Sequence, residues 1–174
     1  ILGGSGSGKS LFARALLGLE EPEQGSIFLD RILIENYEQS SFHDQVALLT
    51  HRPHLFEGSV LENLTFSEDQ LPEANHWLQR LELDSVFYHH ETQLQTPFTF
   101  WGSPVSTREL QRLGLARVLT HKPGTVIIDS FLDAWDLESA KKVAGLLKEV
   151  ESTVFLMTTK QEIAEQMDRV VPWH

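Results

Sequence analysis

The stretch that decides the fold is Gly3-Gly4-Ser5-Gly6-Ser7-Gly8-Lys9-Ser10, near the start of the printed sequence. It fits the pattern G-x-x-x-x-G-K-[ST] at every defined position. Glycines let a backbone curl so tightly that successive N–H groups point inward at one anion, where a Cβ would collide. An apolar pair, Ile1-Leu2, precedes the stretch, and residues 11–19 after it have a helical pattern. This context predicts a phosphate-binding loop rather than a flexible Ser/Gly linker.

Each polar group of this loop has an expected partner on a nucleotide. Lys9 would reach the β- and γ-phosphates, and the Ser10 hydroxyl would be a ligand of Mg²⁺. The helix that follows directs the positive end of its dipole at the same place and adds attraction for an anion. We therefore expect ATP and Mg²⁺ as cofactors. The residues expected to hold the nucleotide are Gly3, Ser5, Gly6, Ser7, Gly8, Lys9, Ser10 and Leu11.

Composition limits the possible partners. The chain has 174 residues, of which 41% are hydrophobic, and this suits a single domain with a real core. The formal net charge of −11 argues against nucleic acid, or an anionic membrane surface, as the main partner. It does not argue against ATP, which the loop would hold locally. No apolar run approaches the length of a membrane span.

The remaining pattern alternates strands and helices. Strands are expected at residues 26–30, 32–34, 45–49, 125–129 and 153–157, and helices at 59–66, 72–83, 106–119, 137–150 and 161–167. Ser106 and Glu109 have the spacing of a capping box at a helix start. An aromatic cluster is expected to be core or interface: Phe87, Tyr88, Phe98, Phe100 and Trp101. The pattern indicates an α/β core that carries a helical insertion.

Asp129 is the second feature with chemical meaning. It closes the unbroken apolar run 125–129, which is typical of a strand buried on both faces. In phosphate-loop proteins an acid at the end of such a strand holds the hydration shell of Mg²⁺. Ser10 and Asp129 are therefore the expected metal residues.

Four further segments carry a resemblance to a known family. They are residues 45–51 (QVALLTH), 55–64 (LFEGSVLENL), 111–119 (QRLGLARVL) and 133–136 (DAWD). In this order they resemble the exporter-type ATP-binding cassette, the nucleotide-binding domain of ABC transporters, in which the last segment is the D-loop. The resemblance runs over the whole chain.

This resemblance implies a fold and a domain organisation. The fold would be that of a P-loop NTPase (RecA-like), with a mostly parallel sheet, helices on both faces and an inserted ABC-type helical subdomain. Residues 1–174 would form one cassette domain, with its core at 1–55 and 116–174 and its helical and signature subdomain at 56–115. The first strands and the last part of the family's domain would lie outside the printed sequence.

Several of the family's motifs are replaced in this chain. Ser130 stands where exporter cassettes have the glutamate that polarises the attacking water, and Thr159 stands where they have the histidine that contacts the γ-phosphate. His51 occupies the position of the Q-loop glutamine. The family's signature Leu-Ser-Gly-Gly-Gln corresponds to Val105, Ser106, Thr107, Arg108 and Glu109.

These replacements predict a site that binds ATP without turning it over. A serine hydroxyl cannot accept a proton from water near pH 7, and general-base help typically contributes about 10²–10⁴ in rate. At the signature, Thr107 and Arg108 add side chains, and Glu109 adds a negative charge that would face phosphate. Arg108 could instead act as a cationic clamp. The helix that starts at Ser106 is expected to have an exposed N-terminus, because it has to meet a partner's nucleotide.

The resemblance also implies partners and a location. The partners would be a second nucleotide-binding domain, identical or different, and the transmembrane domain of an exporter, at the cytoplasmic face of a membrane.

Two alternatives to this function stay open. A phosphate-loop phosphotransferase would close an Arg-bearing lid over the phosphate, yet residues 67–103 hold a single arginine, Arg80. A non-transport scaffold would use ATP only to stabilise its fold.

Overall fold

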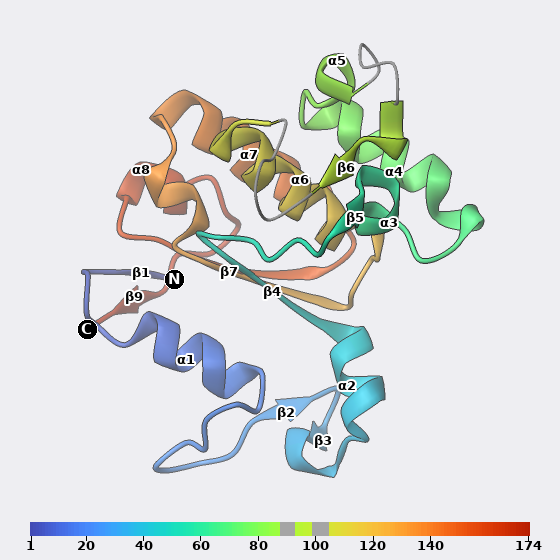
Figure 1. Cartoon of the computed structure of the whole chain (residues 1–174). Helices are drawn as coiled ribbons and strands as arrows, with labels where there is room; N and C mark the ends of the chain where they lie inside the picture. The colour runs from blue at the N-terminus through green and yellow to red at the C-terminus, as the bar shows by residue number, and fades with distance from the viewer. Residues whose placement is uncertain (88–92, 99–104) are drawn as a thin grey trace. The chain divides into compact units, whose positions relative to one another are not determined.

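The buried strands expected from the sequence pair with one another in parallel in the computed structural model (Figure 1). They are β4 (Val46–Thr50), β7 (Thr125–Asp129) and β8 (Thr153–Met157), in the order β4-β7-β8. Val126, Ile127 and Ile128 are fully buried, as expected for a strand covered on both faces. The structure describes residues 1–87, 93–98 and 105–174, which divide into two units: 1–51 with 123–174, and 52–122.

The phosphate-loop stretch starts at the carboxyl edge of this sheet. β1 (Leu2–Gly3) pairs in parallel with β9 (Pro172–Trp173), and a further parallel bridge joins Leu2 to Thr158, directly after β8. The Gly3 amide donates to the Thr158 carbonyl over 3.2 Å. Because the strands run in parallel, the loop after Gly3 and the carboxylate of Asp129 lie at the same edge of the sheet. The expected fold class is confirmed.

Helices cover both faces of this sheet. Figure 1 shows α1 (Lys9–Leu16) on one face and α7 (Leu137–Leu147) with α8 (Gln161–Ala164) on the other. The α1 face is filled by a core of apolar side chains. Its buried members are Ala13, Leu17, Phe42, Val46, Ile127 and Met157. The parallel sheet therefore lies between two layers of helices, as in other α/β proteins.

The helices of this unit are shorter than their sequence patterns predicted. α1 ends at Leu16 because Gly18 adopts a left-handed conformation with φ +69°, and the Leu19 amide donates back to the Arg14 carbonyl over 2.9 Å. A glycine in this conformation is a common helix stop. After α1 come the hairpin β2 (Phe28–Leu29) and β3 (Ile32–Leu33), the turn η1 (Ile34–Asn36) and α2 (Gln39–Gln45).

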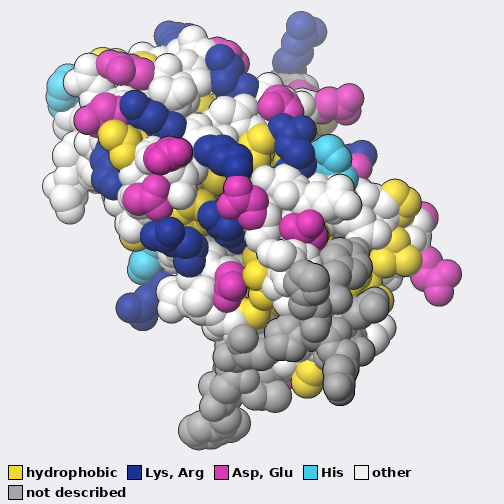
Figure 2. Space-filling view, turned by 90° about the horizontal axis from the view of Figure 1, so that it is seen from above, with side chains coloured by type: hydrophobic (Ala, Val, Ile, Leu, Met, Phe, Trp, Pro, Cys, Tyr) yellow, Lys and Arg dark blue, Asp and Glu magenta, His cyan; other side chains and the backbone are white. Residues whose placement is uncertain are grey.

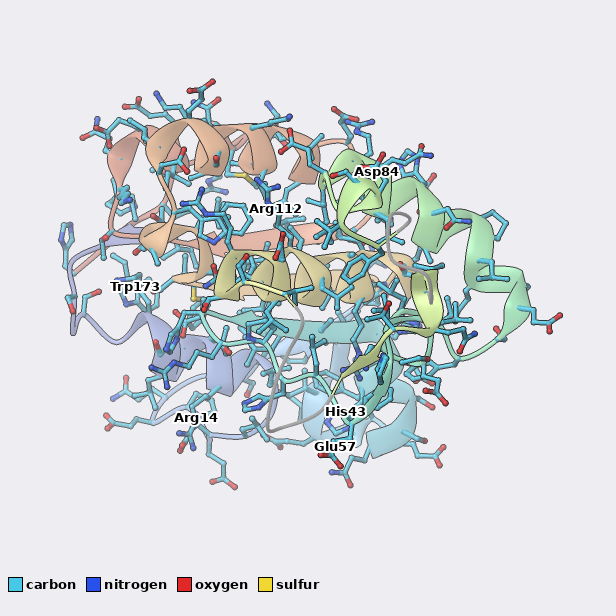
Figure 3. The ribbon with its side chains drawn as sticks, turned by 45° about the horizontal axis from the view of Figure 1, so that its top comes forward. Arg14, His43, Glu57, Asp84, Arg112 and Trp173 are labelled. Atoms are coloured by element: carbon cyan, nitrogen blue, oxygen red, sulfur yellow. The ribbon has the colours of Figure 1, made fainter. Side chains whose placement is uncertain are left out.

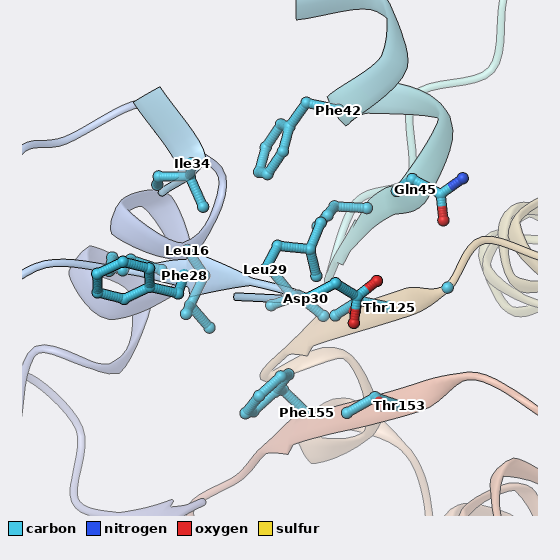
Figure 4. Close-up of a pocket in the computed structure, with 14 residues that line it drawn as sticks. Leu16, Phe28, Leu29, Asp30, Ile34, Phe42, Gln45, Thr125, Thr153 and Phe155 are labelled. Atoms are coloured by element: carbon cyan, nitrogen blue, oxygen red, sulfur yellow. The ribbon is translucent and has the colours of Figure 1, made fainter. Parts of the chain in front are cut away.

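A pocket of about 240 Å³ opens beside this hairpin (Figure 4). Leu16, Phe42 and Phe155 line it together with Thr125 and Thr153, the residues that begin β7 and β8. It therefore lies at the amino ends of these strands. In open α/β sheets ligands bind outside the carboxyl ends of the strands, so this apolar pocket is a poor candidate for a nucleotide site.

The second unit is mostly helical. Its elements are β5 (Gly58–Ser59), α3 (Val60–Leu64), η2 (Glu68–Gln70), α4 (Leu71–Arg80), α5 (Asp84–Phe87), η3 (Gln93–Gln95), β6 (Pro97–Phe98) and α6 (Thr107–Thr120). The capping box expected at Ser106 and Glu109 is present. A second one, formed by Ser59 and Glu62, begins α3. Of the aromatic cluster, Phe87 is buried. Tyr88, Phe100, Trp101 and the side chain of Phe98 lie outside the described residues.

Asn63 is the main polar group in the core of this unit. It is fully buried, and its amide accepts from the Phe56 N–H and donates to the carbonyls of Phe56 and Ser59, each over 3.0 Å. We expect Asn63→Ala to lower the free energy of unfolding by about 2–4 kcal/mol, because three hydrogen bonds are lost and one of their partners, the carbonyl of the buried Ser59, stays without its donor. Urea unfolding measures this loss. Asn36→Ala, at an exposed position, is the control, and a loss below about 0.5 kcal/mol for Asn63→Ala would contradict the role.

Candidate functional site

The loop between β1 and α1 has the backbone of an anion cradle. Gly6 and Gly8 have φ values of +79° and +89°, which side chains other than glycine rarely adopt. A Cβ built on Gly4 or Gly6 would meet no atom within 4 Å, so the loop is open to solvent there. Gly8 is also the N-cap of α1, and the first amides of a helix lack partners within it. Backbone N–H groups and the helix dipole can therefore act on one anion.

Lys9 is held over this loop. Its side chain is 5% exposed, and its ammonium donates to the carbonyls of Gly3, over 2.8 Å, and Gly4, over 2.7 Å. An ammonium has three hydrogens to donate, and two of them go to these carbonyls. The cation is thus fixed beside the open side of the loop rather than extended into solvent. Ser10 and Leu11, the next expected ligands, are exposed on the first turn of α1.

Asp129 and Ser130 form a hydrogen-bonded pair at the end of β7. The Ser130 hydroxyl donates to Oδ1 of Asp129 over 3.1 Å, and the Ser130 amide donates to the Met157 carbonyl over 3.0 Å. Ser130 has a left-handed backbone with φ +52°. The Ser130 hydroxyl is therefore hydrogen-bonded to Asp129, the carboxylate that is expected to hold Mg²⁺. A carboxylate base, which could take a proton from water, is missing from this position.

Thr159 is tied to the D-loop segment by Asp133. Oδ2 of Asp133 accepts from the Thr159 amide over 3.0 Å and from its hydroxyl over 2.9 Å, while Oδ1 accepts from the hydroxyl of Thr158. Both oxygens of one carboxylate therefore hold the turn after β8. This clamp joins the turn η4 (Phe131–Ala134) to Thr159, at which the sequence resemblance predicts a replaced histidine.

Most of the other expected residues are exposed, whereas Val105 and Glu109 are half-buried. His51 follows β4 and its side chain faces solvent. At the signature position, Ser106, Thr107 and Arg108 are exposed at the start of α6, as expected for a helix that has to meet a partner. Glu109 caps its own helix, because its carboxylate accepts a hydrogen bond from the Ser106 amide over 2.6 Å. The start of α6 belongs to the second unit and the phosphate loop to the first.

Magnesium fits this donor set only together with a nucleotide. Among residues 1–87, 93–98 and 105–174 no group of three or more His, Asp or Glu side chains could hold a metal ion. Mg²⁺ usually takes one or two protein oxygens and completes its shell with water and phosphate oxygens. Ser10 and Asp129 supply a hydroxyl and a carboxylate of that kind. The loop, Lys9 and this oxygen pair fit Mg·ATP.

Sequence reasoning missed two residues of this site. Asp133 was assigned only to a D-loop segment, and Trp173 was not singled out, although its indole N–H donates to the Ser7 carbonyl over 2.9 Å. Both act across the fold, so no local pattern marks them. Trp173 lies beside the start of α1 in Figure 3.

Two surface properties bear on partners. On the face drawn in Figure 2, Lys and Arg side chains are interspersed with Asp and Glu rather than gathered into a basic stripe. Nucleic-acid-binding domains usually show such a stripe. In the described part of the chain, every helix is too short or too polar to cross a membrane.

Comparisons with known proteins point to one group. The family model described as "ABC transporter" matches residues 1–132. The chain is 27% identical over 173 residues to the transport/processing ATP-binding protein ComA of Streptococcus pneumoniae, covering 98% of this chain and 24% of that protein. It is 31% identical over 160 residues to the sublancin-168-processing and transport ATP-binding protein SunT of Bacillus subtilis, covering 91% of this chain and 23% of that protein.

One solved structure shows the same fold. An ATP-bound bacterial Atm1-family ABC exporter superposes with a TM-score of 0.85 over 99% of this chain and 31% of its own, at 20% identity. The chain thus spans about a quarter of the length of the two relatives and about a third of that exporter.

Proposed function

The chain belongs to the ABC transporter family, and from that premise we propose that it is the ATP-binding domain of an exporter. One observation carries the proposal: Lys9 is fixed over an open, glycine-built loop, at the same sheet edge as Asp129. The loop amides and Lys9 would hold the phosphates, and Ser10 and Asp129 would hold Mg²⁺. The relatives named for transport and processing support an exporter. Their names and the family match favour this function over a phosphotransferase or a non-transport scaffold.

We further propose that this site holds ATP without cleaving it. Mg²⁺ would shield the charge of the phosphates at the site. The Ser130 hydroxyl donates a hydrogen bond to Asp129 and offers no base, and Thr159 is bound to Asp133. His51, the third replaced position, is exposed after β4. ATP would then act as a link between domains, and a partner with intact motifs would supply hydrolysis.

The proposed partners follow from the exposed signature position. Thr107 and Arg108, at the start of α6, would face the nucleotide of a second cassette, identical or different. The transmembrane domain of the exporter would hold this chain and the second cassette at the cytoplasmic face of the membrane. Nucleic acid is not among the proposed partners, since the chain carries a net charge of −11.

Dimerisation tests this function. We expect the mass of the chain in sedimentation velocity to double in Mg·ATP, alone or mixed with a cassette whose motifs are intact. AMP with Mg²⁺ is the matched control, because it lacks the β- and γ-phosphates that Lys9 would contact. A chain that stays monomeric in saturating Mg·ATP, both alone and in the mixture, would contradict the proposal.

A further inference from the structure

Trp173 lies against the back of the phosphate loop. Its indole N–H donates to the Ser7 carbonyl over 2.9 Å. Its ring packs on Phe12 of α1, with the ring centroids 4.7 Å apart and the planes tilted by 31°. The indole therefore extends from β9 and packs on α1, while its one polar hydrogen goes to the loop. Figure 1 shows these two elements side by side, and Figure 3 labels Trp173 beside the start of α1.

The bond to Ser7 also orients the next amide. The peptide between Ser7 and Gly8 is trans, because the described chain has no cis peptide bond. In a planar trans peptide the C=O and the following N–H point in opposite directions. Trp173 holds the Ser7 carbonyl on its own side of the loop, so the Gly8 N–H points to the other side. That amide belongs to the left-handed residue, φ +89°, that begins α1.

Close packing leaves the loop little freedom on the Trp173 side. A Cβ on Gly3 would lie 2.7 Å from the Trp173 carbonyl and 2.8 Å from the Ser7 hydroxyl oxygen. A Cβ on Gly8 would lie 3.9 Å from the indole nitrogen. The Ser7 amide also donates to the Gly4 carbonyl over 3.3 Å. Both the amide and the carbonyl of Ser7 are therefore hydrogen-bonded, the amide to Gly4 and the carbonyl to Trp173.

We propose that Trp173 is a positioning residue for the phosphate loop. Its indole N–H fixes the Ser7–Gly8 peptide so that the Gly8 amide is directed at the bound phosphate before any ligand arrives. Such preorganisation raises affinity because less ordering is required on binding. The affinity part of this inference rests on the proposed function, whereas the part about loop order does not.

Trp173→Phe tests the inference, because it removes the N–H and keeps a ring for Phe12. We expect affinity for Mg·ATP and for Mg·pyrophosphate to fall by the same factor, about three- to tenfold, as for loss of one hydrogen bond. Without ligand, the NMR order parameter of the Gly8 N–H should fall from about 0.85, typical of rigid backbone, to below about 0.6. Trp77→Phe is the matched control: it also loses an indole hydrogen bond, 2.9 Å to Glu73, but in the second unit. It should change neither quantity.

Each outcome has a defined meaning. If the Gly8 order parameter stays near about 0.85 and both affinities stay within about twofold of the original chain, Trp173 has no positioning role. If the Gly8 order parameter falls but even the original chain does not bind Mg·ATP, the positioning role stands and the proposed function fails. Should Trp173→Phe not fold, hydrogen exchange in the original chain tests the inference instead. Its Trp173 indole hydrogen should exchange slowly, and more slowly with Mg·pyrophosphate, while free exchange would overturn the inference.

Discussion

Replacing Lys9 by alanine should weaken Mg·ATP binding by about 100- to 10,000-fold. The structure fixes this ammonium beside the open loop through the carbonyls of Gly3 and Gly4. Two phosphates would lose a charge-assisted partner, and hydrogen bonds to charged groups contribute about 1.5–3 kcal/mol each. Together these losses correspond to about two to four powers of ten in the dissociation constant. Isothermal titration calorimetry measures the change.

A second lysine controls for the loss of charge. Lys148, after α7, pairs with Asp168 over 3.0 Å and takes no part in the loop. Lys148→Ala removes the same charge and should leave the affinity for Mg·ATP within about twofold of the original, as expected for a surface change. An unchanged affinity in Lys9→Ala would contradict the phosphate-loop assignment.

The second large effect is expected at the replaced catalytic positions. In a dimer with an intact cassette, Ser130→Glu combined with Thr159→His should raise hydrolysis at this chain's loop by about 10²–10⁴. This is the usual contribution of a general base. Ser130→Glu alone should give less, because Thr159 stays bound to Asp133. In a homodimer the same single change should do little, since the signature is also replaced in both copies.

Ser130→Gln distinguishes the effect of a general base from the effect of a larger side chain at this position. Ser130→Gln with Thr159→His has nearly the same size as the glutamate variant but cannot accept a proton from water. The rate should therefore stay near that of the unaltered dimer, as measured by phosphate release. An equal gain with glutamine would show that space or loop order, rather than proton transfer, limits this site.

Much of the fold could be predicted because its signals are local. The runs 125–129 and 153–157 are strands with those bounds. The first is buried at every position but the last, and a parallel strand covered on both faces is a nearly continuous apolar run. The capping box at Ser106 needs only four consecutive residues. The end of α1 was placed too late, because the chain stays apolar through Leu19 while Gly18 has already left the helix.

The supporting residues of the site could not be predicted for the opposite reason. Trp173 reaches Ser7 across 166 positions of the sequence, and Asp133 reaches Thr158 across 25. Such contacts exist only once the parallel strands have aligned at their carboxyl edge. The loop itself was recognisable because glycines, Lys9 and Ser10 follow one another directly in the chain.

The fate of one bound ATP tests the central claim most directly. The chain is held in excess over radiolabelled Mg·ATP, with an intact cassette that carries its own Lys-to-Ala change in the loop, so that only this chain's loop can bind nucleotide. Samples are quenched over an hour and separated into ATP and ADP. We expect the label to stay ATP throughout and to be released as ATP when EDTA removes Mg²⁺. Conversion of the label to ADP within the hour, at any rate up to the several per second of a typical enzyme, would contradict the claim that this site does not cleave ATP.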